Sequence, residues 1–187
     1  MNTVAQAHGQ TQNLYQAMRQ RRVKNPQLKH YALVDGASYL TLGNRFSNAG
    51  DALQWQWLLE GTELDGIKHA GPALVAFTED NARSDGLLEW LISRDVTSPL
   101  VSWLWSVQPF EPLAEHLRSN LFTRLPDGRR ALFRYYNPTV RRALQGVLSE
   151  AQEAELMRPI AYWQVWQPLE NDYLTFASAQ AMEVGDA

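Results

Sequence analysis

The chain has 187 residues, of which 45% are hydrophobic and 20% charged, which supports one domain with a substantial core. Its net charge of −3 does not favour a nucleic-acid-binding protein, and the absence of cysteine excludes disulfides and thiolate chemistry. The sequence shows no signal peptide and no apolar stretch of membrane-spanning length. We therefore expect a soluble, cytoplasmic protein without a membrane span.

The first hundred residues predict helices alternating with buried strands. Apolar residues at helical spacing, or short apolar runs beside Gly and Pro, carry these assignments. Helices are predicted at 11–22, 51–60 (capped by Asp51) and 86–94, and strands at 31–36 and 73–77. Residues 1–10 show no such pattern and are expected to be unstructured.

The segment 99–107 predicts a central strand. Trp103 and Trp105 point to one face, and Leu104 and Ser106 point to the other. Because neither face is strongly polar, we expect layers of structure on both sides of this strand. The seven tryptophans of the chain fit either a Trp-rich core or a protein-binding surface.

The stretch 109–148 predicts a helix, a hairpin and a second helix. The first helix has an apolar stripe, the sequence Leu-Pro-Asp-Gly marks a turn, and Asn137-Pro138 has the residues of a helix start. The stripe is Leu113, Leu117 and Leu121, the turn is 125–128, and the strand after it is 131–136. On the second helix, Val140, Leu144, Val147 and Leu148 are expected to be buried, and Arg141 and Arg142 to lie on the outer side.

The same stretch is basic. It holds seven arginines against three acidic residues, a local charge of +4, so the rest of the chain carries −7. A basic element on an acidic body suits an acidic partner, or it is simply a solvated helix face. The sequence leaves both interpretations open.

The last forty residues predict a capped helix, one more strand and a tail. Ser149 and Gln152 have capping-box spacing, the strand is expected at 160–166, and the chain becomes polar after Pro168. We predict an α/β fold whose mixed sheet has helices on both faces and includes an antiparallel hairpin. The expected organisation is an N-terminal helix and linker over 1–30, an α/β domain over 31–168 and a C-terminal tail over 169–187.

Four segments carry a resemblance to a known family. They are YALVDGA, GPALVAF, a strand ending in Ser before a helix with HLR, and LFRYYNP. In this order they resemble the adaptor/chaperone family of bacterial type VI secretion, which was long labelled a domain of unknown function. The residues within or beside these motifs that we single out are Asp35, Gly71, Pro72, Ser106, His116, Arg118 and Pro138.

The resemblance implies a non-catalytic binding protein. Such an adaptor holds the N-terminal or linker segment of a cognate effector in the cytoplasm and delivers it to the C-terminal region of the VgrG spike, without a cofactor. An apolar or aromatic groove, or an exposed sheet edge, suits that task. The side chains expected to bind the partner are Arg130, Arg134, Tyr136, Arg141, Arg142, Trp163 and Trp166.

Arg134 stands out because it lies within an otherwise apolar predicted strand. A buried arginine needs a partner, and Asp35 or Glu115 is a candidate. Alternatively, Arg134 lies at an edge of the sheet and binds a carboxylate or the backbone of a partner. His116 is expected to be partly buried and hydrogen-bonded.

The sequence contains no known catalytic motif. The four histidines have no metal-ligand spacing, so no metal site is expected and we predict that the protein is not an enzyme. One alternative is an enzyme in which Asp35, Asp51 and Glu79 converge at strand ends. Another is a purely structural oligomerisation module.

Overall fold

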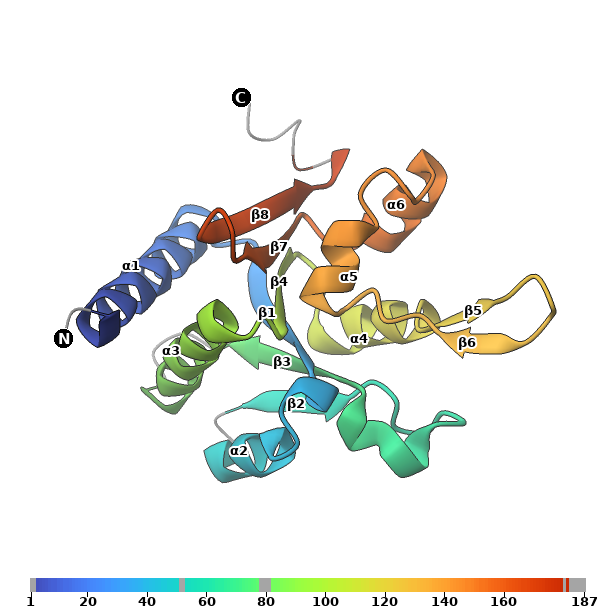
Figure 1. Cartoon of the computed structure of the whole chain (residues 1–187), viewed down its shortest axis with the longest axis horizontal. Coiled ribbons are helices and arrows are strands. Elements are labelled where there is room, and N and C mark those ends of the chain that lie inside the picture. Colours follow the sequence, from blue (N-terminus) through green and yellow to red (C-terminus); the bar gives the residue numbers. More distant parts are fainter. Residues whose placement is uncertain (1–2, 51–52, 78–81, 180, 182–187) are drawn as a thin grey trace.

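The computed structural model describes residues 3–50, 53–77, 82–179 and 181, with side chains described from Thr11 onward. A six-stranded sheet forms its centre, in the order β2-β3-β1-β4-β7-β8 (Figure 1). The strands are β1 (Lys29–Asp35), β2 (Gln54–Trp57), β3 (Pro72–Phe77), β4 (Val101–Ser106), β7 (Tyr162–Gln167) and β8 (Asp172–Ala177).

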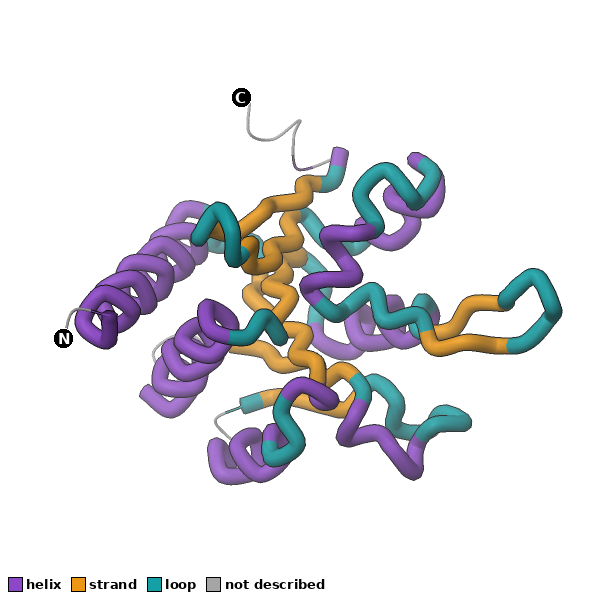
Figure 2. Tube along the Cα trace, viewed as in Figure 1, coloured by secondary structure: helices purple, strands orange, loops and turns teal. Residues whose placement is uncertain are grey.

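Helices cover both faces of this sheet, as Figure 2 shows. One face is covered by α1 (Thr3–Lys24), α2 (Leu42–Ala49) and α3 (Ala82–Thr97), and the other by α4 (Phe110–Ser119), α5 (Pro138–Ala143) and α6 (Glu150–Met157). Short 3₁₀ turns, η1 (Gly36–Ser38) and η3 (Asp65–Ala70), lie near one end of β1. The hairpin of β5 (Phe122–Arg124) and β6 (Arg130–Leu132) reaches away from the body.

The predicted α/β class, with helices on both faces and an antiparallel hairpin, is confirmed. The sheet differs from the expected mixture in that its described pairings are all antiparallel. The strands β3 and β4, which α3 joins, do run in the same direction, but β1 lies between them and runs opposite to both. The alternation of elements in the sequence could not reveal this insertion.

The central position of β4 is confirmed. All six of its residues are buried. Trp103 and Trp105 pack into the core beneath α1 and α3, whereas Leu104 packs into the core beneath α4. Burial of such large side chains on both faces makes β4 the centre of the fold.

The stretch 109–148 begins as predicted. On and just after α4, Leu113, Leu117 and Leu121 are fully buried. In the hairpin turn, the Gly128 amide donates to the Leu125 carbonyl at 2.9 Å, and Gly128 has a φ of 84°, which glycine adopts without strain. The capping box of α6 also forms, between Ser149 and Gln152.

The hairpin and the helix after it are shorter than predicted. The strand expected at 131–136 ends at Leu132, because the Phe133 amide turns to donate to the Leu121 carbonyl at 2.7 Å. The helix α5 ends at Ala143, so the helical stripe expected up to 148 breaks, and Val147 is 71% exposed rather than buried.

Three further predictions are wrong. Part of the helix expected at 51–60 is the strand β2, where the alternation Gln-Trp-Gln-Trp follows the period of a strand; the proposed cap Asp51 lies outside the described residues. The tail expected from residue 169 contains β8, which pairs along the whole of β7. The helix α1 begins at Thr3, within the segment expected to be unstructured.

Candidate functional site

The motif residues meet at the end of β1. Asp35 is fully buried, and its Oδ2 accepts hydrogen bonds from Arg134 Nη2 at 2.7 Å and Asn137 Nδ2 at 2.8 Å. Its Oδ1 accepts from the Ala37 amide at 3.2 Å. The predicted pair of Arg134 with Asp35 is therefore confirmed, although Arg134 lies after β6 and its side chain is 45% exposed.

Two glycines let the backbone approach closely beside this carboxylate. The Gly36 amide donates to the Gly71 carbonyl at 3.0 Å. A Cβ on Gly36 would lie 2.6 Å from that oxygen, and one on Gly71 would lie 2.6 Å from Leu59 Cγ. No side chain fits at either position without a shift, so the motif segments around residues 35 and 71 hold the fold together.

The HLR segment of α4 has the same structural role. Arg118 Nε donates to the Leu58 carbonyl at 3.2 Å, and His116 Nε2 lies 3.1 Å from the Leu156 carbonyl. Burial lowers the pKa of His116, which fits the predicted partly buried, hydrogen-bonded histidine. Ser106 Oγ donates to the Pro159 carbonyl and accepts from the Gln108 amide. These side chains connect α4 and β4 to the loop after β2 and to the end of α6.

Four of the seven side chains expected to bind a partner are buried. Trp163, Trp166 and Tyr136 belong to the interior, with at most 1% of each exposed. Arg141 is fully buried as well, although helical spacing placed it on the outer side of a longer helix. Because α5 is short and α6 folds over it, that side of α5 faces the interior. In this conformation these four side chains are therefore not accessible to a partner, and their partner-binding role stays a prediction.

Arg141 is held by one carboxylate and two rings. Its guanidinium donates twice to the Glu153 carboxylate, once at 3.2 Å from Nη1. It lies 3.7 Å from the ring centre of Phe176 and 5.1 Å from that of Trp163. This contact fastens α5 and α6 to the last two strands.

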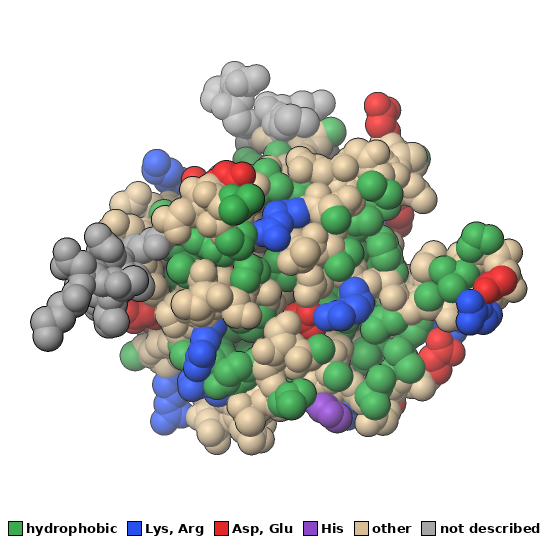
Figure 3. Space-filling model, in the orientation of Figure 1, with side chains coloured by type: hydrophobic (Ala, Val, Ile, Leu, Met, Phe, Trp, Pro, Cys, Tyr) green, Lys and Arg blue, Asp and Glu red, His purple; other side chains and the backbone are tan. Residues whose placement is uncertain are grey.

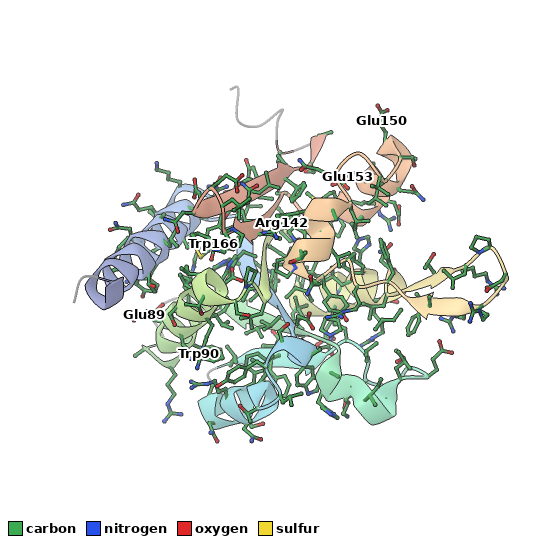
Figure 4. The ribbon with its side chains drawn as sticks, in the orientation of Figure 1. Glu89, Trp90, Arg142, Glu150, Glu153 and Trp166 are labelled. Carbon is green, nitrogen blue, oxygen red and sulfur yellow. The ribbon has the colours of Figure 1, made fainter. Side chains whose placement is uncertain are left out.

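The other three predicted side chains remain at least partly accessible. Arg142 donates from α5 to the Trp166 carbonyl, and Figure 4 labels both residues. Arg130 is exposed, pairs with Glu63 at 3.1 Å, and lies over the ring of Phe122 at 4.5 Å. Arg134 combines its bond to Asp35 with an exposed flank. Arg142 lies on α5, Arg130 in β6 and Arg134 after β6, so the three side chains do not form one continuous basic face.

An apolar groove lies beside the hairpin instead. It has a volume of about 350 Å³ between the end of α4, the root of the hairpin and α6. Figure 3 shows the hairpin standing apart from the body, with hydrophobic side chains on both sides of the gap. Its apolar lining includes the half-buried side chains of Phe122, Phe133 and Leu148 and the buried side chain of Leu156.

Apolar side chains gathered around an open groove mark interaction sites on soluble proteins. Two exposed apolar side chains lie on the elements that flank the groove: Val147, in the loop between α5 and α6, is 71% exposed, and Leu125, at the hairpin turn, is 38% exposed. No local sequence pattern predicts the groove, because it depends on α6 packing near the hairpin. The one available signal was that residues 131–136 are too apolar for a free hairpin.

The residues that the structure describes contain no group of three His, Asp or Glu side chains able to hold a metal ion. Of the three carboxylates in the alternative enzyme site, Asp35 is occupied by its hydrogen bonds, and Asp51 and Glu79 lie outside the described residues. Within the described ranges, no helix is both long and apolar enough to cross a membrane.

The chain belongs to the family described as Domain of unknown function (DUF4123), whose model matches residues 30–155. The match begins in β1 and ends in α6, so it includes Asp35, the two glycines, the HLR segment and the groove lining except Leu156. No curated protein and no solved structure matches the chain.

Proposed function

We propose that this protein is a type VI secretion adaptor. In the cytoplasm it binds the N-terminal or linker segment of a cognate effector and delivers it to the VgrG spike, without catalysis. The four motifs that resemble the adaptor family support this proposal, because they occur in order and meet in one part of the fold.

The observation that carries the proposal is the open apolar groove between the hairpin and α6. A segment with one apolar face can bury that face against Phe122, Phe133 and Leu148. Grooves of this kind recognise amphipathic helices or extended chains. A secreted toxin kept in this way has its exposed apolar segment covered until it reaches the spike.

Co-purification tests the proposal. The tagged protein is expressed with the VgrG proteins and modular toxins encoded in its own bacterium, and captured proteins are identified by mass spectrometry. We expect an effector, a VgrG protein or both. If none of these associates when they are co-expressed at high level, the adaptor proposal fails.

A double variant tests the groove itself. Thr123→Glu with Ala151→Glu places charges on two exposed positions that line the groove, so the fold should remain intact while capture falls about tenfold or more, because charges there oppose an apolar contact. The matched control is Thr97→Glu with Ala177→Glu, which makes the same two substitutions at exposed positions outside the groove lining. Equal capture by both double variants would exclude the groove as the binding surface.

A further inference from the structure

The helices α2 and α3 lie near each other, on the face of the sheet opposite α4 (Figure 1). An open pocket of about 550 Å³ lies between them, with polar and apolar surface in nearly equal parts. Thr41, Asn44, Arg45 and Asn48 line it from the α2 side, and Arg83 lines it from α3. All five side chains are exposed, so the pocket is a surface depression rather than an internal cavity.

Two arginines and two aromatic rings alternate beside this pocket. The rings of Tyr39 and Trp90 meet edge to face at 5.1 Å. The guanidinium of Arg45 lies 4.0 Å from the ring centre of Trp90, and that of Arg94 lies 5.4 Å from the ring centre of Tyr39. Figure 4 labels Trp90 on the α2 side of α3, with Glu89 farther from α2. Each guanidinium therefore packs against an aromatic ring, and the two rings hold each other in position.

The arginines of this row have free capacity to donate. Arg45 and Arg94 are exposed, and neither forms an ion pair with a carboxylate among the described residues. Stacking occupies the flat face of a guanidinium and leaves its N–H groups at the edge, where they match the two oxygens of a carboxylate. The hydrogen bond from Arg45, followed by one with Thr41, lowers the pKa of the Tyr39 hydroxyl.

The openness and composition of the pocket indicate its class of ligand. A small molecule is usually enclosed by a mainly apolar cavity, which this pocket is not. Arginine, tyrosine and tryptophan are the side chains that dominate protein–protein contacts. A long polyanion such as nucleic acid needs an extended basic surface, and the net charge of −3 opposes its approach.

We propose that the pocket between α2 and α3 is a docking site for an acidic segment of a partner protein. Arg45 and Arg94 bind carboxylates of that segment, and Tyr39 and Trp90 pack against its apolar parts. Leu40, which is 77% exposed next to Tyr39, extends the apolar contact. This inference stands on its own contacts and does not depend on the role of the hairpin groove.

Fluorescence anisotropy with defined probes tests this proposal. The probe is a labelled peptide of about ten residues with alternating Glu and Leu, and its counterpart has Gln in place of Glu. We expect the Glu peptide to bind at least about tenfold more tightly than the Gln peptide, and binding to weaken as salt rises. A labelled DNA single strand of similar length should bind more weakly than the Glu peptide.

Charge reversal locates the site. Arg45→Glu with Arg94→Glu should weaken binding of the Glu peptide at least about tenfold. Arg124→Glu with Arg129→Glu makes the same change of net charge on the exposed hairpin and should leave the affinity within about twofold. Arg45→Lys with Arg94→Lys keeps the charge but loses the planar fork, so an intermediate loss is expected. Melting temperatures near that of the unmodified chain show that these variants fold.

Several results would overturn the inference. They are equal binding of the Glu and Gln peptides, equal weakening by the two charge-reversal pairs, tighter binding of the DNA strand, or no binding of the Glu peptide at concentrations up to about 1 mM. Loss of effector capture by the groove variants, without loss of Glu-peptide binding, would separate this site from the groove.

Discussion

The two faces of the central sheet bury polar groups in different ways. On the α1 and α3 side, His30 and Asp95 are buried, and neither forms an ion pair with another described residue. Beneath α5 and α6, the buried cation Arg141 has the carboxylate of Glu153. An ion pair persists from neutral pH down to the acid range in which carboxylates are protonated, whereas a titratable group that is buried in its neutral form makes stability depend on pH closer to neutrality.

The unpaired groups are held in apolar surroundings. The ring of His30 stacks on Trp105 at 4.7 Å, and burial, then Arg22 and Arg21, lowers its pKa to about 3. Asp95 accepts hydrogen bonds from the Leu100 and Val101 amides, from Trp103 and from Tyr173, all neutral donors. Burial raises its pKa to about 6 despite these bonds.

The largest effect is expected from breaking the paired face. Glu153→Ala leaves the guanidinium of Arg141 buried without its carboxylate, which should lower the free energy of unfolding by about 3 kcal/mol in urea denaturation. Replacing both partners, as Arg141→Met with Glu153→Ala, should cost less, about 1 kcal/mol, because no buried charge remains. Glu155→Ala, which removes an exposed pair with Arg158, is the control with little effect. If Glu153→Ala is as mild as this control, Arg141 is not confined as described.

The next effect is the acid sensitivity of the unpaired face. Because the pKa of His30 is about 3 in the folded chain and near 6.5 when unfolded, the unfolded state binds more protons between these values. Well above pH 6.5, the titration of His30 does not lower the free energy of unfolding. As the pH falls, it lowers that free energy increasingly, by about 2 kcal/mol at pH 5.

His30→Phe removes this titration while keeping a ring beside Trp105. The free energy of unfolding of the unmodified chain minus that of the variant should therefore fall by about 2 kcal/mol as the pH falls from 7 to 5, whatever its value at pH 7. His69→Phe makes the same change at an exposed histidine and should leave the pH profile unaltered. Parallel profiles for His30→Phe and the unmodified chain would show that His30 does not remain neutral in the folded state.

The smallest effect concerns the link between β8 and α3. Tyr173→Phe removes the hydrogen bond to Asp95, 3.0 Å long, and should cost about 1 kcal/mol at pH 8. The folded chain holds a proton on Asp95 that the unfolded chain loses between about pH 4 and 6, so stability from this group falls as the pH rises through that window. Without the hydrogen bond from Tyr173, the pKa of Asp95 rises further, so the decrease in stability continues to higher pH.

The loss in Tyr173→Phe should therefore be smaller at pH 4 than at pH 8. Thermal unfolding at the two pH values measures it, with Tyr162→Phe on the neighbouring strand as the control. A loss that is equal at both pH values would mean that Tyr173 acts through packing alone.

The sequence predicted the parts of the molecule that local signals define. The Asn137 and Ser149 caps, the apolar stripe of α4 and the turn at Gly128 depend only on nearby residues, and all are present. The pair of Asp35 with Arg134 could also be predicted, because an arginine among apolar residues requires a partner.

The rest depends on contacts between segments that are distant in the chain. Helical spacing alone placed Arg141 outward, but α6 and β8 enclose it. The strand β8 is half-polar because it is an edge strand, so its composition resembles a tail. The groove and the pocket between α2 and α3 are formed by elements whose packing no local pattern encodes.

The position of β1 has a consequence for how the chain folds. It leaves the ribosome before either of its neighbours, which come much later in the chain: Asp35 pairs with Pro72, and Lys29 with Ser106. Non-local pairing of this kind slows folding. Until β3 and β4 have been synthesised, the apolar β1 has two open edges, and unpaired apolar strands of this kind favour aggregation. A protein proposed to cover a segment of another chain therefore has, during its own synthesis, a strand whose two edges are unpaired.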